Sequence, residues 1–121
     1  VLRGMHVNMK HPQGKLIRVL SGEILDVVID LRKESKTYMS CFSICLSAQN
    51  YKQLYIPKGM GHGYLALQDS RVLFKVTTHY IPDDEIGFAW NSAAINIDWG
   101  IQEPIQNSKD KNSKDLSEVW L

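Results

Sequence analysis

Short runs of β-branched and aromatic residues, separated by turn-forming residues, fill most of this 121-residue chain. No long stretch repeats apolar residues at the three- and four-residue spacing of an amphipathic helix, so the pattern predicts a mainly β protein. Seven or eight strands at such short spacing favour a sandwich or barrel, and a small jelly roll in particular. After a polar stretch, residues 115–121 could form one or two helical turns as a C-terminal tail. We expect strands over these ranges: 15–20, 24–31, 38–46, 53–56, 62–67, 71–80, 88–90 and 95–99.

The length fits one domain over residues 1–121, and the formal net charge of +1 gives no bulk attraction to nucleic acid or to an anionic membrane. No apolar run approaches the roughly 18–20 residues that span a bilayer, and the start lacks the features of a signal peptide. We therefore expect a soluble, cytoplasmic protein. Cys41 and Cys45 lie four residues apart in a predicted strand, about 13 Å at the rise of a strand, which is too far for a disulfide. We expect both to be reduced, buried thiols.

The first group of residues that could act chemically is Arg3-Gly4-Met5-His6, with Lys15 nine residues after the histidine. Histidine titrates near neutral pH and is the side chain best suited to proton transfer there. Taken alone the pattern is weak, because a histidine at a strand end beside surface cations would look the same.

The second group is the heptapeptide from Pro57 to Gly63, in which three glycines and a proline set a tight turn before His62. Pro-x-Gly-x-x-His is also the second motif of the cupin jelly rolls. Metal-binding cupins add a His-x-His motif, but Asn8 stands two residues after His6, and no His-x-His occurs in the chain. We expect neither a catalytic transition metal nor another cofactor. The alternative reading of His62 is a histidine that only forms hydrogen bonds within the turn.

Two acidic residues are considered next. Asp26 lies on the strand face opposite the more apolar one, and points either to solvent or into a polar barrel interior. Asp110 lies in the polar tail and, on composition, is a solvated charge. A histidine base nevertheless needs an acceptor at its other ring nitrogen, so we expect one acid near His6.

Taken in order, these motifs resemble those of the thymidine-diphosphate-4-dehydrorhamnose 3,5-epimerases and related nucleotide-sugar epimerases. The resemblance extends over nearly all 121 residues. It implies a metal-free, cupin-like jelly-roll barrel (a double-stranded β-helix) that is usually a homodimer and acts on a nucleoside-diphosphate 4-keto-6-deoxy sugar. The matching segments are 3–6, 13–15, 22–30, 46–50, 56–64 and 97–99.

The same resemblance implies the roles of individual residues. His6 matches the general base that removes a proton beside the ketone, and Asp110 matches the carboxylate that orients it. Lys15 matches the cation that stabilises the enolate oxygen. Arg3 would bind the substrate, including its diphosphate. Three further residues match pocket positions: His62, Asp26 and Tyr80.

The sequence departs from the family at the position of the tyrosine that protonates the opposite face of the sugar, where this chain has Phe74. Tyr80, six residues further along the predicted strand, would share a face with Phe74 but lie about 20 Å away. We therefore expect epimerisation at one centre, or protonation by water or another group, in place of full 3,5-epimerisation.

Family members also have about fifty residues before the Arg-Gly-x-His motif, so the domain is expected to be N-terminally incomplete relative to the family, with strand edges for a dimer partner to cover. The leading interpretation is an isomerase of dTDP-rhamnose-type sugar biosynthesis. A nucleotide-sugar ketoisomerase and a non-catalytic cupin that binds sugar nucleotides or carbohydrates remain as alternatives.

Overall fold

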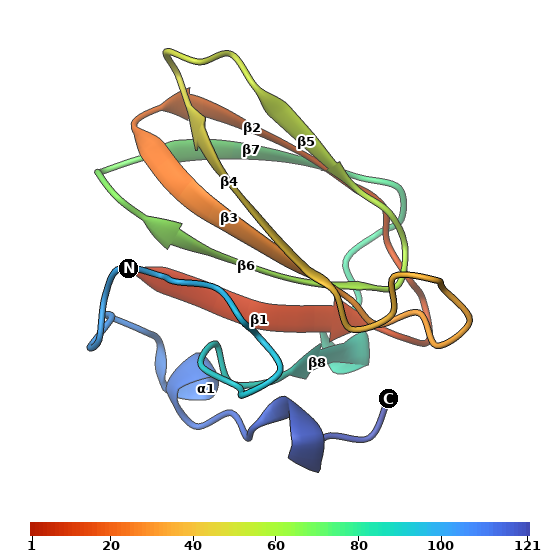
Figure 1. Cartoon of the computed structure of the whole chain (residues 1–121). Helices are drawn as coiled ribbons and strands as arrows, with labels where there is room; N and C mark the ends of the chain where they lie inside the picture. The colour runs from red at the N-terminus through yellow and green to blue at the C-terminus, as the bar shows by residue number, and fades with distance from the viewer.

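The computed structural model describes all 121 residues and contains two antiparallel sheets, as Figure 1 shows. The larger sheet has the strand order β4-β3-β6-β1-β8, and the smaller has the order β5-β2-β7. The strands are β1 Leu2–Asn8, β2 Lys15–Ser21, β3 Glu23–Asp30, β4 Cys41–Ser47, β5 Gln53–Ile56, β6 Met60–Ala66, β7 Arg71–Val76 and β8 Glu85–Gly87. The helical elements are the 3-10 turns η1 Pro82–Asp84 and η2 Leu116–Glu118 and the short helix α1 Ser108–Lys111. The fold is thus mainly β, a cupin-like jelly roll with a short helical tail, as the sequence predicted.

Both faces of β3 are buried, which explains why apolar and polar residues alternate so weakly along this strand. Ile24 and Val28 belong to a cluster between the two sheets, together with Ile17 of β2. Val27 and Ile29 belong to a second cluster on the other face of the large sheet, which the C-terminal segment covers. In Figure 1 this blue segment and the small sheet lie on opposite sides of β1. The more apolar face of β3 therefore packs under the C-terminal segment, and the face that carries Asp26 looks into the barrel.

Two predicted strands have different bounds. The strand expected at 38–46 is β4, Cys41–Ser47, and the long strand expected at 71–80 stops at Val76. Strand β7 stops there because its partner β2 begins at Lys15, which pairs with Val76. Beyond Thr77 the chain has no partner strand with which to form backbone hydrogen bonds. The Gln13 side chain donates hydrogen bonds to the carbonyl oxygens of Thr78 and His79 in place of such a strand. Tyr80 therefore lies outside β7.

Residues 88–90 and 95–99 are not strands, which corrects the prediction for both. Phe88, Ile95 and Trp99 are buried in the cluster beneath the large sheet. Their apolar spacing reflects this packing, since a loop that covers a sheet buries side chains without forming a ladder. The thiol prediction is also partly wrong, because Cys41 is half-buried and Cys45 is exposed, although both are free.

None of the helical elements has the length and apolar content needed to cross a lipid bilayer.

Candidate active site

The barrel brings His6 and Asp110 together from opposite ends of the chain. His6 lies on β1, and its Nε2 is 2.6 Å from Oδ1 of Asp110. The other carboxylate oxygen of Asp110 accepts a hydrogen bond from the backbone N–H of Gly4 at 3.1 Å. Asp110 is only 2% exposed, so it is not the solvated charge that composition alone suggests, and it lies where the family resemblance implies the orienting carboxylate. The contact leaves the carboxylate paired on both oxygens and fixes the orientation of the imidazole.

The position of Asp110 depends on the local structure of α1. Asn107 caps this short helix, and its side-chain oxygen accepts a hydrogen bond from the Asp110 N–H at 2.8 Å. The polar segment that looks like a solvated tail in the sequence is thereby folded against β1. Asp110 points inward from it.

Glu85 of β8 is a member of the site that the sequence did not indicate. Its Oε1 lies 3.5 Å from Nδ1 of His6 and 3.4 Å from Nζ of Lys109. Because Asp110 holds Nε2, Nδ1 is the ring nitrogen that remains to accept a proton. No motif surrounds Glu85 in the sequence, and only the pairing of β8 with β1 places it beside His6.

Lys15 begins β2 and is half-buried. Burial lowers the pKa of its ammonium group below the ordinary lysine value, and the negative charges of Glu85 and Asp26 oppose that shift. The two carboxylates are therefore close enough to act on Lys15 electrostatically. A cation in this partly desolvated place interacts more strongly with a developing negative charge than a solvated one does.

His62 and Asp26 form a second buried pair on neighbouring strands, β6 and β3. The distance from His62 Nε2 to Asp26 Oδ1 is 2.7 Å, and the two residues are 5% and 0% exposed. The N–H direction is too oblique for a well-formed hydrogen bond, and neither oxygen of Asp26 has another partner. The aspartate thus lies in the barrel interior, the second of the two positions that the sequence left open. His62 also lies directly opposite His6 across β6 and β1.

An aromatic group lies next to this pair. The Tyr64 ring is 6.1 Å from the His62 ring and 5.9 Å from that of Phe74, between centroids. Tyr64, Phe74 and Arg3 line a cavity of about 690 Å³ beside the turn between β6 and β7. His6 and Lys15 are not among the residues that line it. Tyr80 is 65% exposed and lines none of this cavity, so the structure does not place it with the other predicted pocket residues.

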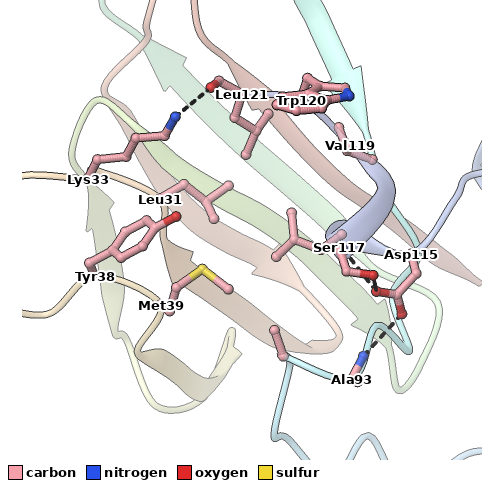
Figure 2. Close-up of a pocket in the computed structure, with 12 residues that line it drawn as sticks. Leu31, Lys33, Tyr38, Met39, Ala93, Asp115, Ser117, Val119, Trp120 and Leu121 are labelled. Atoms are coloured by element: carbon pink, nitrogen blue, oxygen red, sulfur yellow. Dashed lines mark hydrogen bonds between the residues drawn. The ribbon is translucent and has the colours of Figure 1, made fainter.

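A second cavity, of about 450 Å³, lies away from these residues and is drawn in Figure 2. It is mostly apolar and lies where the C-terminal segment passes Leu31 and Met39. A hydrogen bond from Lys33 Nζ to the Leu121 carbonyl oxygen, 2.9 Å long, crosses one end of it. None of the predicted site residues lines this cavity.

The structure contains no group of three or more His, Cys, Asp or Glu side chains arranged to hold a metal ion. The charged groups of the site instead pair with one another. The arrangement consists of an oriented imidazole, a partly desolvated ammonium group and a cavity whose mouth carries a guanidinium group. Such a set can remove a proton from carbon and stabilise the resulting oxyanion.

Comparison with known proteins agrees with this reading. The sequence model of the dTDP-4-dehydrorhamnose 3,5-epimerase family matches residues 1–118. The enzyme of that name from Methanothermobacter thermautotrophicus is 43% identical over 98% of this chain and 66% of its own length. The chain therefore spans just under two thirds of that relative.

Solved structures share the fold. The RmlC epimerase from Legionella pneumophila, in complex with dTDP-4-keto-L-rhamnose, has a TM-score of 0.91 and 36% identity, over 98% of this chain and 64% of that chain. A 3′-monoepimerase from Streptomyces bikiniensis, in complex with dTDP-quinovose, has a TM-score of 0.87 and 28% identity, over 97% of this chain and 61% of that chain.

Proposed function

The chain belongs to the dTDP-4-dehydrorhamnose 3,5-epimerase family, and from that premise we propose that it is an isomerase that epimerises a nucleoside-diphosphate 4-keto-6-deoxy sugar. The reaction inverts carbon 3, carbon 5 or both, which lie beside the ketone. The observation that supports it most directly is the buried His6–Asp110 pair. A protein that only bound sugar would have no use for an oriented base.

The chemistry follows from the positions of the side chains. With Nε2–H donated to Asp110, Nδ1 of His6 is free to take the proton from the carbon beside the ketone. The electron pair of the broken C–H bond moves into the ketone, and the resulting enolate oxygen is stabilised by the charge of Lys15. When a proton returns to the same carbon from the other face, the C=O bond reforms and the centre is inverted.

Substrate binding is assigned to the mouth of the barrel. Arg3 lines the 690 Å³ cavity and carries a guanidinium fork that suits diphosphate oxygens. His62 and Asp26 would form the inner wall next to the sugar, with Phe74 at its side. The nucleotide in the Legionella complex is a thymidine diphosphate, which makes a dTDP sugar the first substrate to test.

The side chain of Phe74 has no proton to give, so the donor on the second face must be another group or water. For this reason we propose epimerisation at one centre, or reprotonation by a group other than residue 74. A 3′-monoepimerase among the structural relatives supports the possibility of reaction at a single centre.

We further propose that residues 1–121 act as one domain within a homodimer. The edge strand β7 supports this, because Leu73 and Val76 are 40% and 46% exposed and one edge of the strand is unpaired. An unpaired edge of this kind presents N–H and C=O groups with which a strand of another chain can pair. Free thiols at Cys41 and Cys45 fit a reducing compartment, and we propose the cytoplasm as the place of action.

The test is to incubate the purified protein with a dTDP-4-keto-6-deoxy sugar in heavy water and to follow carbons 3 and 5 by NMR. Deuterium entering with inversion supports an epimerase. If deuterium enters neither carbon although the nucleotide sugar binds, the proposal fails in favour of a binding protein. Movement of the ketone to another carbon would instead indicate a ketoisomerase.

A further inference from the structure

Inversion needs a proton donor on the face of the sugar away from His6, and the cavity offers few. A guanidinium group such as that of Arg3 does not serve as a proton donor. Asp69 also lines the cavity, but it lies on the exposed turn between β6 and β7. Ser70 is too weak an acid. The remaining lining side chain with an acidic proton is Tyr64.

We propose that Tyr64 is the general acid that protonates the reacting carbon on the face opposite His6. This inference rests on the proposed function and supplies the donor that Phe74 cannot be.

The strand register sets the distance between base and acid. His6 pairs with His62 across β1 and β6, and Tyr64 follows two residues later on the same face of β6. In a regular ladder such diagonal positions are about 7–8 Å apart at their bases. Here the register of β1 shifts between Arg3, which pairs with Tyr64, and His6. A sugar ring standing on edge between them would present one face to His6 and the other to Tyr64.

The contact between Tyr64 and Phe74 places the phenol beside the position where the family resemblance implies an acid. The two ring centroids are 5.9 Å apart, and both rings line the same cavity. Tyr64 therefore carries its hydroxyl group on a ring that borders the same cavity as Phe74. Moving the hydroxyl from residue 74 to residue 64 keeps a donor in the pocket while changing the angle from which it acts.

The surroundings of Tyr64 keep its hydroxyl protonated. Burial raises the pKa of Tyr64 above the ordinary tyrosine value, the positive charge of Arg3 opposes the rise, and the charges of Asp26 and Asp110 add to it. The phenol is thus in the donor form at neutral pH. Arg3 is also placed to stabilise the phenolate that is left once the proton has been given.

The proposed step balances. One C–H bond breaks as a proton moves to His6 Nδ1, and the electron pair is held on the enolate oxygen next to Lys15. The Tyr64 O–H bond then breaks, its proton forms the new C–H bond, and the ketone returns. Exchange with water removes the proton from His6 and restores the one on Tyr64, so no oxidant or co-reactant is needed.

The test compares Tyr64→Phe with the unaltered protein in heavy water, with Tyr51→Phe as the matched control, because Tyr51 is 80% exposed. We expect deuterium entry to stay within about threefold in Tyr64→Phe, because His6 still works, while inversion falls by about 10²-fold or more. We also expect Phe74→Tyr, added to Tyr64→Phe, to recover a large part of the inversion. That recovery would not follow if Tyr64 only supported the fold.

Equal inversion rates in Tyr64→Phe and the unaltered protein would overturn the inference and leave the proposed function intact. Parallel loss of deuterium entry and inversion would also overturn it, by assigning Tyr64 to binding. If the unaltered protein shows neither deuterium entry nor inversion, both the inference and the proposed function are wrong.

Discussion

Nε2 of His6 lies 2.6 Å from Oδ1 of Asp110, although 104 residues separate them in the chain. Strand β1 and helix α1 meet so closely because Gly4 donates its backbone N–H to the same carboxylate. The pair thereby links the Arg3–His6 segment at the start of the chain to the polar segment near its end, and it defines which nitrogen of His6 is free to react.

Replacing His6 by alanine is expected to reduce deuterium entry by about 10²- to 10⁴-fold, the usual contribution of a general base. NMR in heavy water measures it. His79→Ala is the matched control, because His79 is exposed and only its backbone oxygen forms a hydrogen bond. Unchanged deuterium entry in His6→Ala would remove the base from the mechanism.

Asp110→Asn should lower the turnover rate by about 10²-fold or more, because the amide N–H₂ group would donate to Nε2 and shift the ring proton to Nδ1. The free nitrogen would then no longer accept a proton. The control is Asp98→Asn, at an exposed carboxylate that accepts a hydrogen bond from Gly100 N–H, which asparagine can also do. A steady-state rate equal to that of the control would show that Asp110 does not set the tautomer of His6.

The lowered pKa of Lys15 predicts how activity depends on pH. The ammonium charge is present below this pKa and is lost as pH rises through it, so the turnover rate should fall on the alkaline side at a lower pH than an ordinary lysine would give. Lys15→Arg keeps its charge and should move this alkaline fall to higher pH, whereas Lys15→Met should lose about 10²-fold or more at every pH. Identical pH profiles for the arginine variant and the unaltered protein would assign the fall to another group.

Gly63 lets β6 approach β1 closely. A Cβ atom at this position would lie 2.6 Å from Met5 Sδ and 2.8 Å from the Arg3 carbonyl oxygen. Gly63→Ala is expected to lower the free energy of unfolding by about 1–3 kcal/mol, and to reduce activity as well, because β1 carries His6. Denaturant titration and the heavy-water assay measure the two effects.

Gly100→Ala is the control for Gly63→Ala. Gly100 has a positive φ of 71° but no atom within 4 Å of the position of a Cβ, so this substitution adds backbone strain without displacing β1. We expect it to lower stability and leave deuterium entry unchanged. Equal activity in the two glycine variants would contradict the link between strand spacing and the site.

Several parts of the fold could be predicted from local sequence. Alternating and β-branched runs indicated six of the strands, four of them (β2, β3, β5 and β6) with bounds within two residues of those observed, and turn residues such as Gly22 marked the junctions between them. The strands predicted around Phe88 and Ile95 were wrong because the spacing of apolar residues indicates only which side chains are buried. A loop that covers a sheet buries side chains at the same spacing as a strand does.

The candidate site divides in the same way. His6, Lys15 and His62 stood out because each lies in a short motif of unusual composition. Glu85 and Tyr64 gave no such signal, since a glutamate after a turn and a tyrosine in a strand are ordinary in β proteins. Glu85 and Tyr64 belong to the candidate site only because their strands, β8 and β6, pair with β1, which carries His6.

By itself, the sequence determined the β class, the histidines and lysine with the right chemistry, and the absence of a hydroxyl group at residue 74, because each depends only on residue type and short-range spacing. Only the tertiary structure decided that Tyr80 lies outside the pocket, that Tyr64 lines it, and that Asp110, which the family resemblance matched to the orienting carboxylate, is buried beside His6. Burial and pairing arise from contacts between segments far apart in the chain, and no local pattern of residues specifies those contacts.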